Sequence, residues 1–268
     1  MFSPIIIGHR GLGAGDIENT RMAFREAVRL GIDMVELDVM STSDGHLVVF
    51  HDRNLVRMTF NPKDIKDITL EDLKKEFLPF NQKILTFDEF LEEFDGKIDF
   101  NIEIKGRKIE EQVFERIKDL KSKVFVTSLK KETIVRFARI SKGKRNFPIG
   151  VIFYPDRVPP IPYYWDLAVV TPLSYLKDRD LLFHSFLRRK NKLIILGVDF
   201  LEDSQLDPLL KYVPNDFDGI ITNYPLRWKK VREKVKNKEV MPKKKNGGIA
   251  IYKFFKKSKS LEQSYTYR

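Results

Sequence analysis

The strongest constraint on the fold is a repeated alternation along the chain. Eight short apolar runs with strand-like composition are separated, in most cases, by runs with the 3.6-residue period of an amphipathic helix. Alternating strands and helices are typical of a parallel sheet with helical crossovers. The apolar runs are Ile5–Gly8, Met34–Val39, Ile98–Ile104, Val124–Ser128, Pro148–Phe153, Leu167–Thr171, Leu193–Val198 and Gly219–Thr222. Eight such units predict an α/β protein built as a closed (β/α)8 barrel, the TIM barrel.

Amphipathic runs lie between most of these strand candidates. Thr86 and Glu89 have the spacing of a capping box, and Gly31 suits the position that follows a helix. A helix of this length can return the chain to the start of the next parallel strand. The predicted helices are Thr20–Leu30, Thr86–Phe94, Ile109–Leu120, Lys131–Ile140, Lys177–Arg189, Asp203–Tyr212 and one that begins near Pro225.

One further apolar run, His46–Phe50, does not fit the alternation. It follows Val39 after too few residues for a parallel crossover, which needs a dozen or more. Asp44-Gly45 between the two runs is a strong hairpin signal. We therefore predict that residues 34–51 form an antiparallel hairpin that extends the second barrel strand. A turn centred near residues 44–45 would place His51 opposite Asp38.

The net charge of +11 is concentrated at one end of the chain. Residues 227–268 hold 15 Lys or Arg and three acids, so residues 1–226 are close to neutral. We expect residues 1–236 to form the barrel, with a small insertion over one mouth at about 52–83, and residues 237–268 to form a basic extension. Residues 249–260 alternate apolar, aromatic and Lys residues, which predicts either weak contact with a membrane surface or a solvated tail. Any binding of nucleic acid by this tail would be nonspecific.

Several classes of protein are disfavoured by composition. The chain has no cysteine, so we expect no disulfides, no thiolate chemistry and no Cys-ligated zinc. No apolar run approaches 18 residues, and the first residues do not resemble a secretory signal. These features together predict a cytoplasmic protein, at most peripheral to the inner membrane face.

Charged side chains gather at the predicted carboxyl ends of three strands. In a parallel barrel these ends meet on one rim, where active sites form. Residues two apart on a strand point to the same face, so pairs of charged residues at that spacing face one way. The residues that converge are His9 and Arg10 after the first strand, Glu36 and Asp38 on the second, Glu103 and Lys105 on the third, and His51 on the hairpin.

This set of side chains favours phosphodiester cleavage. Three clustered carboxylates repel one another and are costly to bury, whereas Mg²⁺, Ca²⁺ or Mn²⁺ would bind such oxygen ligands. With Arg10 and Lys105 the site would attract an anion, and phosphate is the natural guest. Two histidines could serve as general base and general acid. The alternative is that Glu36 and Asp38 belong to a purely structural ion-pair network.

Four other residues admit simpler interpretations. Glu18 either caps the helix that starts at Thr20 or belongs to the site. Asp52 either orients a neighbour such as His51 or caps the insertion. We expect His46, near the hairpin turn, to be exposed to solvent, and His184, within a predicted helix, to be structural.

The motifs in which these residues stand resemble those of the glycerophosphodiester phosphodiesterase family. The likeness spans roughly residues 4–230 and is most specific in the first 60. The last strand, DGIITNYP, and the helix start ILTFDEFL also resemble the family. The main motifs are GHRG at 8–11, ENT at 18–20, VELDV at 35–39, TSDG at 42–45, VVFHD at 48–52, LVRMT at 55–59 and NIEIK at 101–105.

The resemblance implies a TIM barrel that hydrolyses glycerophosphodiesters to glycerol phosphate and an alcohol. In the family's usual scheme a neighbouring hydroxyl of the substrate attacks phosphorus, and water then opens the cyclic phosphate. Two alternatives stay open: a lysophospholipase D acting at a membrane surface, and a barrel that only binds phosphorylated ligands. The implied roles are acid/base for His9 and His51, ligation of Mg²⁺ or Ca²⁺ for Glu36, Asp38 and Glu103, and phosphate binding for Arg10 and Lys105. We further expect Glu18, Asn19 and Asp52 to support these residues.

The chain departs from the family pattern at three places. Ile17 stands where proline is usual, residues 196–199 read LGVD where WTVN is usual, and Asn223 stands where aspartate usually follows the threonine. We expect these departures to alter substrate preference more than chemistry.

Overall fold

The computed structural model describes residues 4–153, 165–170, 192–198 and 218–236. Eight parallel strands form a closed barrel, because β1 pairs with β9 on one side and with β2 on the other. The strands are β1 Ile5–Gly8, β2 Met34–Ser41, β4 Asp99–Ile104, β5 Val124–Ser128, β6 Ile149–Phe153, β7 Leu167–Val170, β8 Leu193–Val198 and β9 Gly219–Thr222. The predicted TIM barrel is confirmed.

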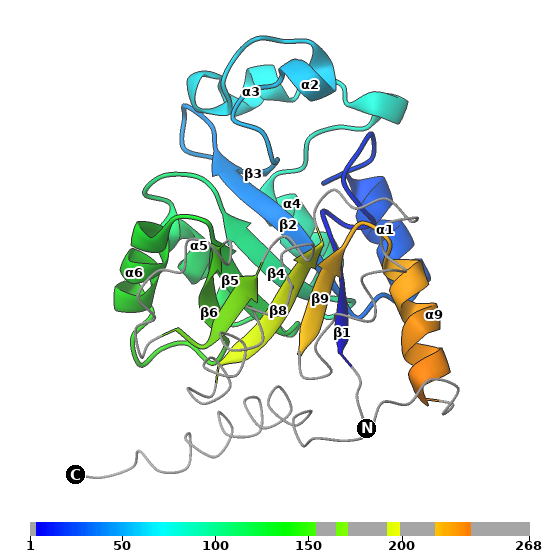
Figure 1. Cartoon of the computed structure of the whole chain (residues 1–268). Helices are drawn as coiled ribbons and strands as arrows, with labels where there is room; N and C mark the ends of the chain where they lie inside the picture. Colours follow the sequence, from blue (N-terminus) through cyan, green and yellow to red (C-terminus); the bar gives the residue numbers. More distant parts are fainter. Residues whose placement is uncertain (1–3, 154–164, 171–191, 199–217, 237–268) are drawn as a thin grey trace, which may run out of the picture.

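Helices pack around the outside of this sheet (Figure 1). The predicted helix signals are present: Thr86 and Glu89 form a capping box, and Gly31 follows the first helix with φ of 62°. The predicted helices Lys177–Arg189 and Asp203–Tyr212, and His184, lie outside the described residues. The long helices are α1 Arg21–Arg29, α4 Phe87–Phe94, α5 Glu110–Ile117, α6 Lys131–Ile140 and α9 Pro225–Lys236.

Alternation along the strands divides the core into two layers. Inside the barrel, Ile7 of β1 packs in one cluster with Phe125 of β5 and Ile195 of β8. Between sheet and helices, Phe24 and Phe90 meet edge to face with ring centroids 4.8 Å apart. The inward positions nearest the carboxyl ends of β2 and β4 are the ones that carry charge, and there the apolar interior gives way to the site.

The hairpin is present, but its predicted register is wrong by one residue. β3 (Leu47–Val49) pairs antiparallel with β2, with Val39 opposite Val49. Phe50 therefore stands at the position opposite Asp38, and its N–H donates to the Asp38 carbonyl at 3.0 Å. The physical reason is the turn: Thr42 N–H donates to the His46 carbonyl at 3.0 Å, which closes a three-residue loop and not a two-residue one.

Residues 52–83 rise beyond the carboxyl end of β2 (Figure 1). They contain two short helices, α2 (Val56–Thr59) and α3 (Leu70–Leu73), and two 3₁₀ turns, η1 (Ile65–Asp67) and η2 (Pro79–Asn81). The segment has a small core of its own, which includes buried Leu55, Ile65 and Leu73. This separate core lets α2 stand beside the rim as a fixed element.

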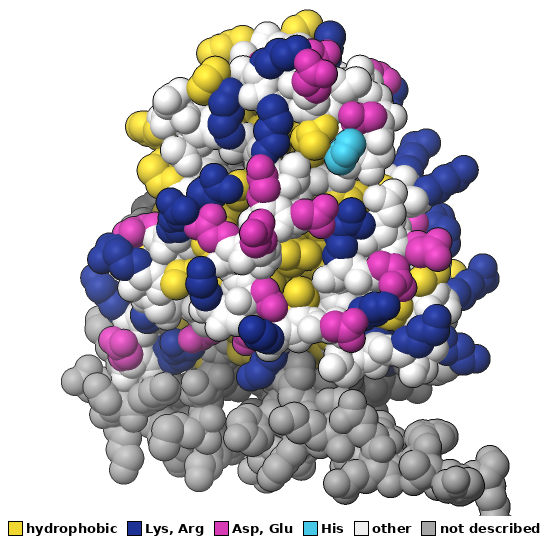
Figure 2. Space-filling model, turned by 180° about the vertical axis from the view of Figure 1, so that it is seen from behind, with side chains coloured by type: hydrophobic (Ala, Val, Ile, Leu, Met, Phe, Trp, Pro, Cys, Tyr) yellow, Lys and Arg dark blue, Asp and Glu magenta, His cyan; other side chains and the backbone are white. Residues whose placement is uncertain are grey.

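The surface of the described part shows no single-sign field on the face in Figure 2, where acidic and basic side chains interleave. This agrees with the near-neutral charge of residues 1–226. In the described residues, none of the helices combines the length and the apolar character that crossing a bilayer requires.

Candidate functional site

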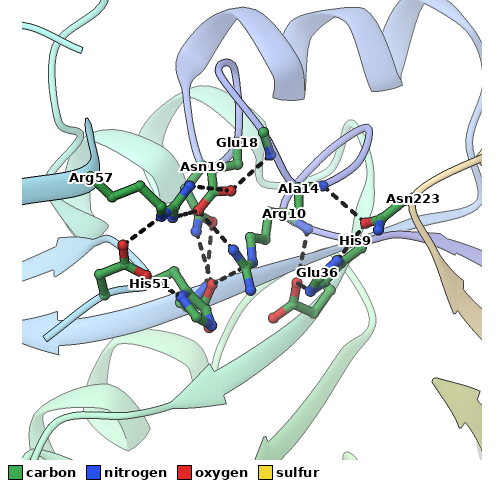
Figure 3. A network of polar contacts seen from close by, with 12 residues as sticks. His9, Arg10, Ala14, Glu18, Asn19, Glu36, His51, Arg57 and Asn223 are labelled. Atoms are coloured by element: carbon green, nitrogen blue, oxygen red, sulfur yellow. Dashed lines mark hydrogen bonds and ion pairs between the residues drawn. The ribbon is translucent and has the colours of Figure 1, made fainter. Parts of the chain in front are cut away.

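The rim at the carboxyl ends of β1, β2 and β4 brings the predicted residues together (Figure 3). His9 and Arg10 follow β1, and Lys105 directly follows β4. His51 comes two residues after β3 ends, where the strict alternation of a strand no longer applies, and so it reaches the site in spite of the shifted register. The other members are Glu36 and Asp38 on β2 and Glu103 on β4.

Three carboxylates form the buried centre of this rim. One oxygen from each of Glu36, Asp38 and Glu103 lies within 4.8 Å of the others. Burial and the neighbouring carboxylates raise the pKa of Glu103 to about 8, and they raise that of Glu36 well above its usual value. Burial also works against ionisation of Asp38, but nearby cations, Lys105 first among them, lower its pKa to about 2. In the protein alone, these three groups do not readily carry three negative charges.

The donor set fits a hard divalent cation. It consists of carboxylate oxygens, which Mg²⁺, Ca²⁺ and Mn²⁺ prefer. Asp38 Oδ1 is buried and makes no hydrogen bond within the described residues. A cation could bind this oxygen, which also faces Lys105 Nζ at 3.4 Å, and would offset the repulsion that helps to raise the pKa values of the two glutamates. The cluster could therefore bind one divalent ion.

Two cations flank the carboxylates. The Arg10 guanidinium donates to Glu18 at 2.8 Å and lies 3.5 Å from Asp38 Oδ2, while its backbone N–H donates to Glu36 at 2.8 Å. Arg10 has a left-handed backbone with φ of 49°, which turns the chain back over the rim directly after β1. Lys105 Nζ lies 3.4 Å from Asp38 Oδ1. The two positive groups thus stand beside the acidic cluster, where an anion bridging them would also face a bound cation.

His9 is buried at the start of the loop after β1. Its Nδ1 lies 2.6 Å from Asn223 Oδ1, and its Nε2 lies 3.9 Å from Glu36 Oε2. The ring therefore has one nitrogen toward the end of β9 and the other toward the carboxylates.

His51 has a comparable arrangement with a charged partner. Its Nδ1 lies 2.6 Å from Asp52 Oδ1. Burial lowers the pKa of His51, whereas an arginine and His51 itself hold the Asp52 pKa below its usual value in spite of burial. Because an ionised carboxylate only accepts hydrogen bonds, Nδ1 is the donor in this pair. Asp52 thus orients His51.

Glu18 and Asn19 lie within the site. Thr20, and not Glu18, caps α1 by accepting the Ala23 N–H. Asn19 donates to Asp38 Oδ2 at 2.9 Å, which fixes the second oxygen of that carboxylate. His46, by contrast, is exposed on the hairpin turn, as predicted.

Sequence reasoning missed two residues of this network. Arg57 on α2 joins Asp52 and Glu18: its Nε donates to Asp52 at 2.6 Å, and both terminal nitrogens donate to Glu18. Its position inside the LVRMT motif was a signal that could have pointed to it. Asn223 was visible only as a departure from the family pattern at the end of the last strand.

Comparisons with known proteins agree with this geometry. The sequence profile of the "Glycerophosphoryl diester phosphodiesterase family" matches residues 9–143. A glycerophosphodiester phosphodiesterase of Caldanaerobacter subterraneus is 32% identical over 243 residues, which cover 82% of this chain and 94% of that protein. A lysophospholipase D of Rattus norvegicus is 35% identical over 129 residues, which cover 43% of this chain and 41% of that protein.

Solved structures show the same likeness. The crystal structure of a glycerophosphodiester phosphodiesterase from Thermotoga maritima superposes with a TM-score of 0.69 at 26% identity and covers 85% of this chain and 98% of that one. The profile match, the full-length relative and the barrel with its acidic rim lead to one conclusion. The chain belongs to the glycerophosphoryl diester phosphodiesterase family, whose members hydrolyse phosphodiesters.

Proposed function

We propose that this protein hydrolyses glycerophosphodiesters to glycerol phosphate and an alcohol, with one divalent cation held by Glu36, Asp38 and Glu103. Mg²⁺ and Ca²⁺ are the proposed ions, and Mn²⁺ suits the same donor set. The observation that carries the proposal is the buried carboxylate triad, whose oxygens lie within 4.8 Å of one another, beside two histidines and two cationic side chains. The name of the Caldanaerobacter relative, a glycerophosphodiester phosphodiesterase, supports glycerophosphodiesters as the substrate class.

In the proposed mechanism, Arg10 and Lys105 bind the phosphoryl oxygens and orient the diester. One of the two histidines takes the proton from the substrate hydroxyl that neighbours the phosphate, and that oxygen attacks phosphorus. The other histidine gives a proton to the departing alcohol, which leaves a cyclic phosphate. Water then opens the ring with the histidine roles reversed. A bound divalent ion would supply charge stabilisation to the phosphoryl oxygens.

The test is release of glycerol phosphate from three glycerophosphodiesters and of acyl glycerol phosphate from a lysophospholipid. The diesters are glycerophosphocholine, glycerophosphoethanolamine and glycerophosphoglycerol, and each substrate is assayed with Mg²⁺, Ca²⁺, Mn²⁺ or EDTA. We expect metal-dependent release that His9→Ala abolishes and that His46→Ala leaves unchanged. Absence of release from every substrate, with metal bound, would leave the alternative of a barrel that only binds phosphorylated ligands.

A second candidate is a lysophospholipase D that works at a membrane surface on the cytoplasmic side. It is favoured by the partial match to a protein of that name and by Phe60 and Phe80 in the insertion, which are 90% and 66% exposed. In this proposal residues 1–236 are the catalytic barrel and residues 237–268 are a basic extension that touches anionic lipid. Flotation with phosphatidylglycerol vesicles, comparing the full chain with residues 1–236, tests this contact. Equal flotation of the two would show that the extension does not bind the membrane.

A further inference from the structure

Asn223 has no part in the acid–base chemistry proposed above, yet its side chain touches His9. It follows β9 directly, and its Oδ1 lies 2.6 Å from His9 Nδ1. The same oxygen accepts the Ala14 backbone N–H at 2.9 Å. Figure 3 shows Asn223 reaching from β9 to these two residues of the loop after β1.

The Ala14 contact identifies which end of the amide faces the loop. A backbone N–H only donates, so the atom it meets must be the amide oxygen, because the amide NH₂ would place two donors face to face. An amide oxygen only accepts, so the ring nitrogen of His9 that shares it must carry a hydrogen. In neutral His9 this places the hydrogen on Nδ1 and the lone pair on Nε2.

We propose that Asn223 is a positioning residue that holds neutral His9 as the Nδ1–H tautomer and thereby directs the unprotonated Nε2 toward the carboxylates. The distance of 3.9 Å from Nε2 to Glu36 Oε2 places that nitrogen on the reacting side of the ring. Turning the ring over would put a carbon-bound hydrogen against the amide oxygen and lose the hydrogen bond. The inference rests on the proposed function of His9, but the tautomer can be measured without substrate.

The surrounding backbone fixes this contact. The His9 N–H donates to the Thr222 carbonyl at 3.0 Å, which ties the residue before Asn223 to the ring's own backbone. A Cβ at Gly13 would lie 2.6 Å from the Asn223 carbonyl oxygen, so only glycine lets the loop lie this close to the end of β9. The amide is therefore held against the loop by main-chain contacts on both sides.

The first experiment reads the tautomer directly. The full chain, labelled with ¹⁵N-histidine and saturated with diamagnetic Mg²⁺, is examined by long-range ¹H–¹⁵N correlation at a pH where the ring signals show neutral imidazole. The chain has four histidines, so His→Gln variants assign each signal. We expect the Nδ1–H pattern for His9 in the wild type and in Asn223→Asp, which keeps an acceptor. Asn223→Ala should shift His9 toward the Nε2–H pattern.

Turnover gives the second readout. Asn223→Ala should lower kcat about tenfold or more and change KM less than about twofold, because it removes orientation and not substrate contact. Asn223→Asp should retain most of the wild-type kcat. The control is Asn61→Ala, since that amide bonds Glu76 in the insertion, away from the site; it should leave both the spectrum and kcat unchanged.

The wild-type spectrum tests the tautomer assignment even if a variant fails to fold. A His9 signal of the Nε2–H type in the wild type would overturn the inference, as would an unchanged His9 tautomer in folded Asn223→Ala. If circular dichroism shows that Asn223→Ala is unfolded, Asn223→Val takes its place. A wild type that shows the Nδ1–H pattern but hydrolyses no substrate would refute the proposed function and leave the tautomer assignment standing.

Discussion

Two halves of the same barrel differ in what their strands carry. β2 and β4 hold the acidic triad and β1 leads into His9 and Arg10, whereas β5 to β9 contain no Asp, Glu, Lys, Arg or His. The uncharged half contributes only side chains such as Phe125 and Ile195 to the barrel interior. The charged half contributes Ile7 and Met34 to the same interior cluster, and toward the rim it buries carboxylates whose pKa values are raised. The acidic centre is thus confined to one side of the closed sheet.

The largest expected effect lies in the charged half. His51→Ala or His9→Ala should lower kcat by about 10²–10⁴, the range expected for a lost general acid or base. The matched control is His46→Ala on the exposed hairpin turn, which should leave kcat unchanged. Steady-state release of glycerol phosphate measures all three. Full turnover by His51→Ala would remove this histidine from the mechanism.

The uncharged half should respond in stability and not in chemistry. Phe125 is 1% exposed in the barrel interior, so Phe125→Ala should lower the free energy of unfolding by about 3–5 kcal/mol, through lost burial and a cavity. Urea unfolding measures this, and calorimetry should show little change in Mg²⁺ affinity of the folded protein. Phe80→Ala, at a 66% exposed position, is the control and should stay within about 0.5 kcal/mol of the wild type. A large loss of Mg²⁺ affinity in Phe125→Ala would show that the halves are coupled.

Neutralising one carboxylate of the charged half should raise the free energy of unfolding, whereas Phe125→Ala should lower it. The pKa of Glu103 is about 8 in the folded, metal-free protein and near 4.5 in the unfolded chain, so the folded state binds more protons between these values. Compared with Glu103→Gln, the free energy of unfolding of the metal-free wild type should therefore fall as pH rises from about 5 to about 8. Glu103→Gln should be more stable than the wild type at pH 8 by about 1–3 kcal/mol, because it removes a charge that is buried beside two other carboxylates.

Two further comparisons complete the measurement of stability against pH. Saturating Mg²⁺ should stabilise the wild type at pH 8 more than it stabilises Glu103→Gln, because the cation takes over the charge that the substitution removes. The control is Glu115→Gln, an exposed glutamate of α5 that forms an ion pair with Lys118 and should not alter the pH dependence. If the stability of the metal-free wild type does not fall relative to Glu103→Gln between pH 5 and 8, the raised pKa of Glu103 is contradicted.

The smallest expected effect is at Arg57, which connects the insertion to the site. Arg57→Ala should lower kcat about tenfold, because Asp52 and Glu18 lose the side chain that fixes both, and His51 loses its orientation. Arg57→Lys keeps the charge but cannot reach both carboxylates with a fork of donors, so it should recover part of the loss. Arg53→Ala, which removes an exposed pair with Asp64 in the same insertion, should leave kcat unchanged. If Arg57→Ala and Arg53→Ala change kcat equally, Arg57 does not support the site.

Much of the fold followed from local pattern. The strand and helix alternation predicted the closed barrel, and residues at i and i+2 predicted that Glu36 and Asp38 would share the inner face. The hairpin register did not follow, because Asp44-Gly45 is compatible with a two-residue and a three-residue loop. Only the bond between Thr42 and His46 distinguishes them.

The contacts within the site could be predicted only in part. Spacing located the acids and histidines, but the partners of their outer atoms depend on how loops from distant segments pack. Arg57 reaches the rim from α2, and Asn223 reaches it from the end of β9, 214 residues from His9 in sequence. No local periodicity encodes such a meeting. The raised pKa values of the glutamates likewise arise from burial, which the spacing of residues alone does not determine.

The closure of the barrel has a consequence for synthesis. β1 pairs with β9 through four residue positions and with β2 through two. β1 emerges from the ribosome long before residues 219–222 are synthesised. The nascent chain therefore exposes a run of isoleucines with one side of its backbone unpaired. His9 and Asn223, 214 residues apart, can meet only after the last strand has been made. A nascent chain that lacks β9 therefore has an incomplete site at His9 and an unpaired apolar strand edge, which is open to pairing with a neighbouring chain on the same message.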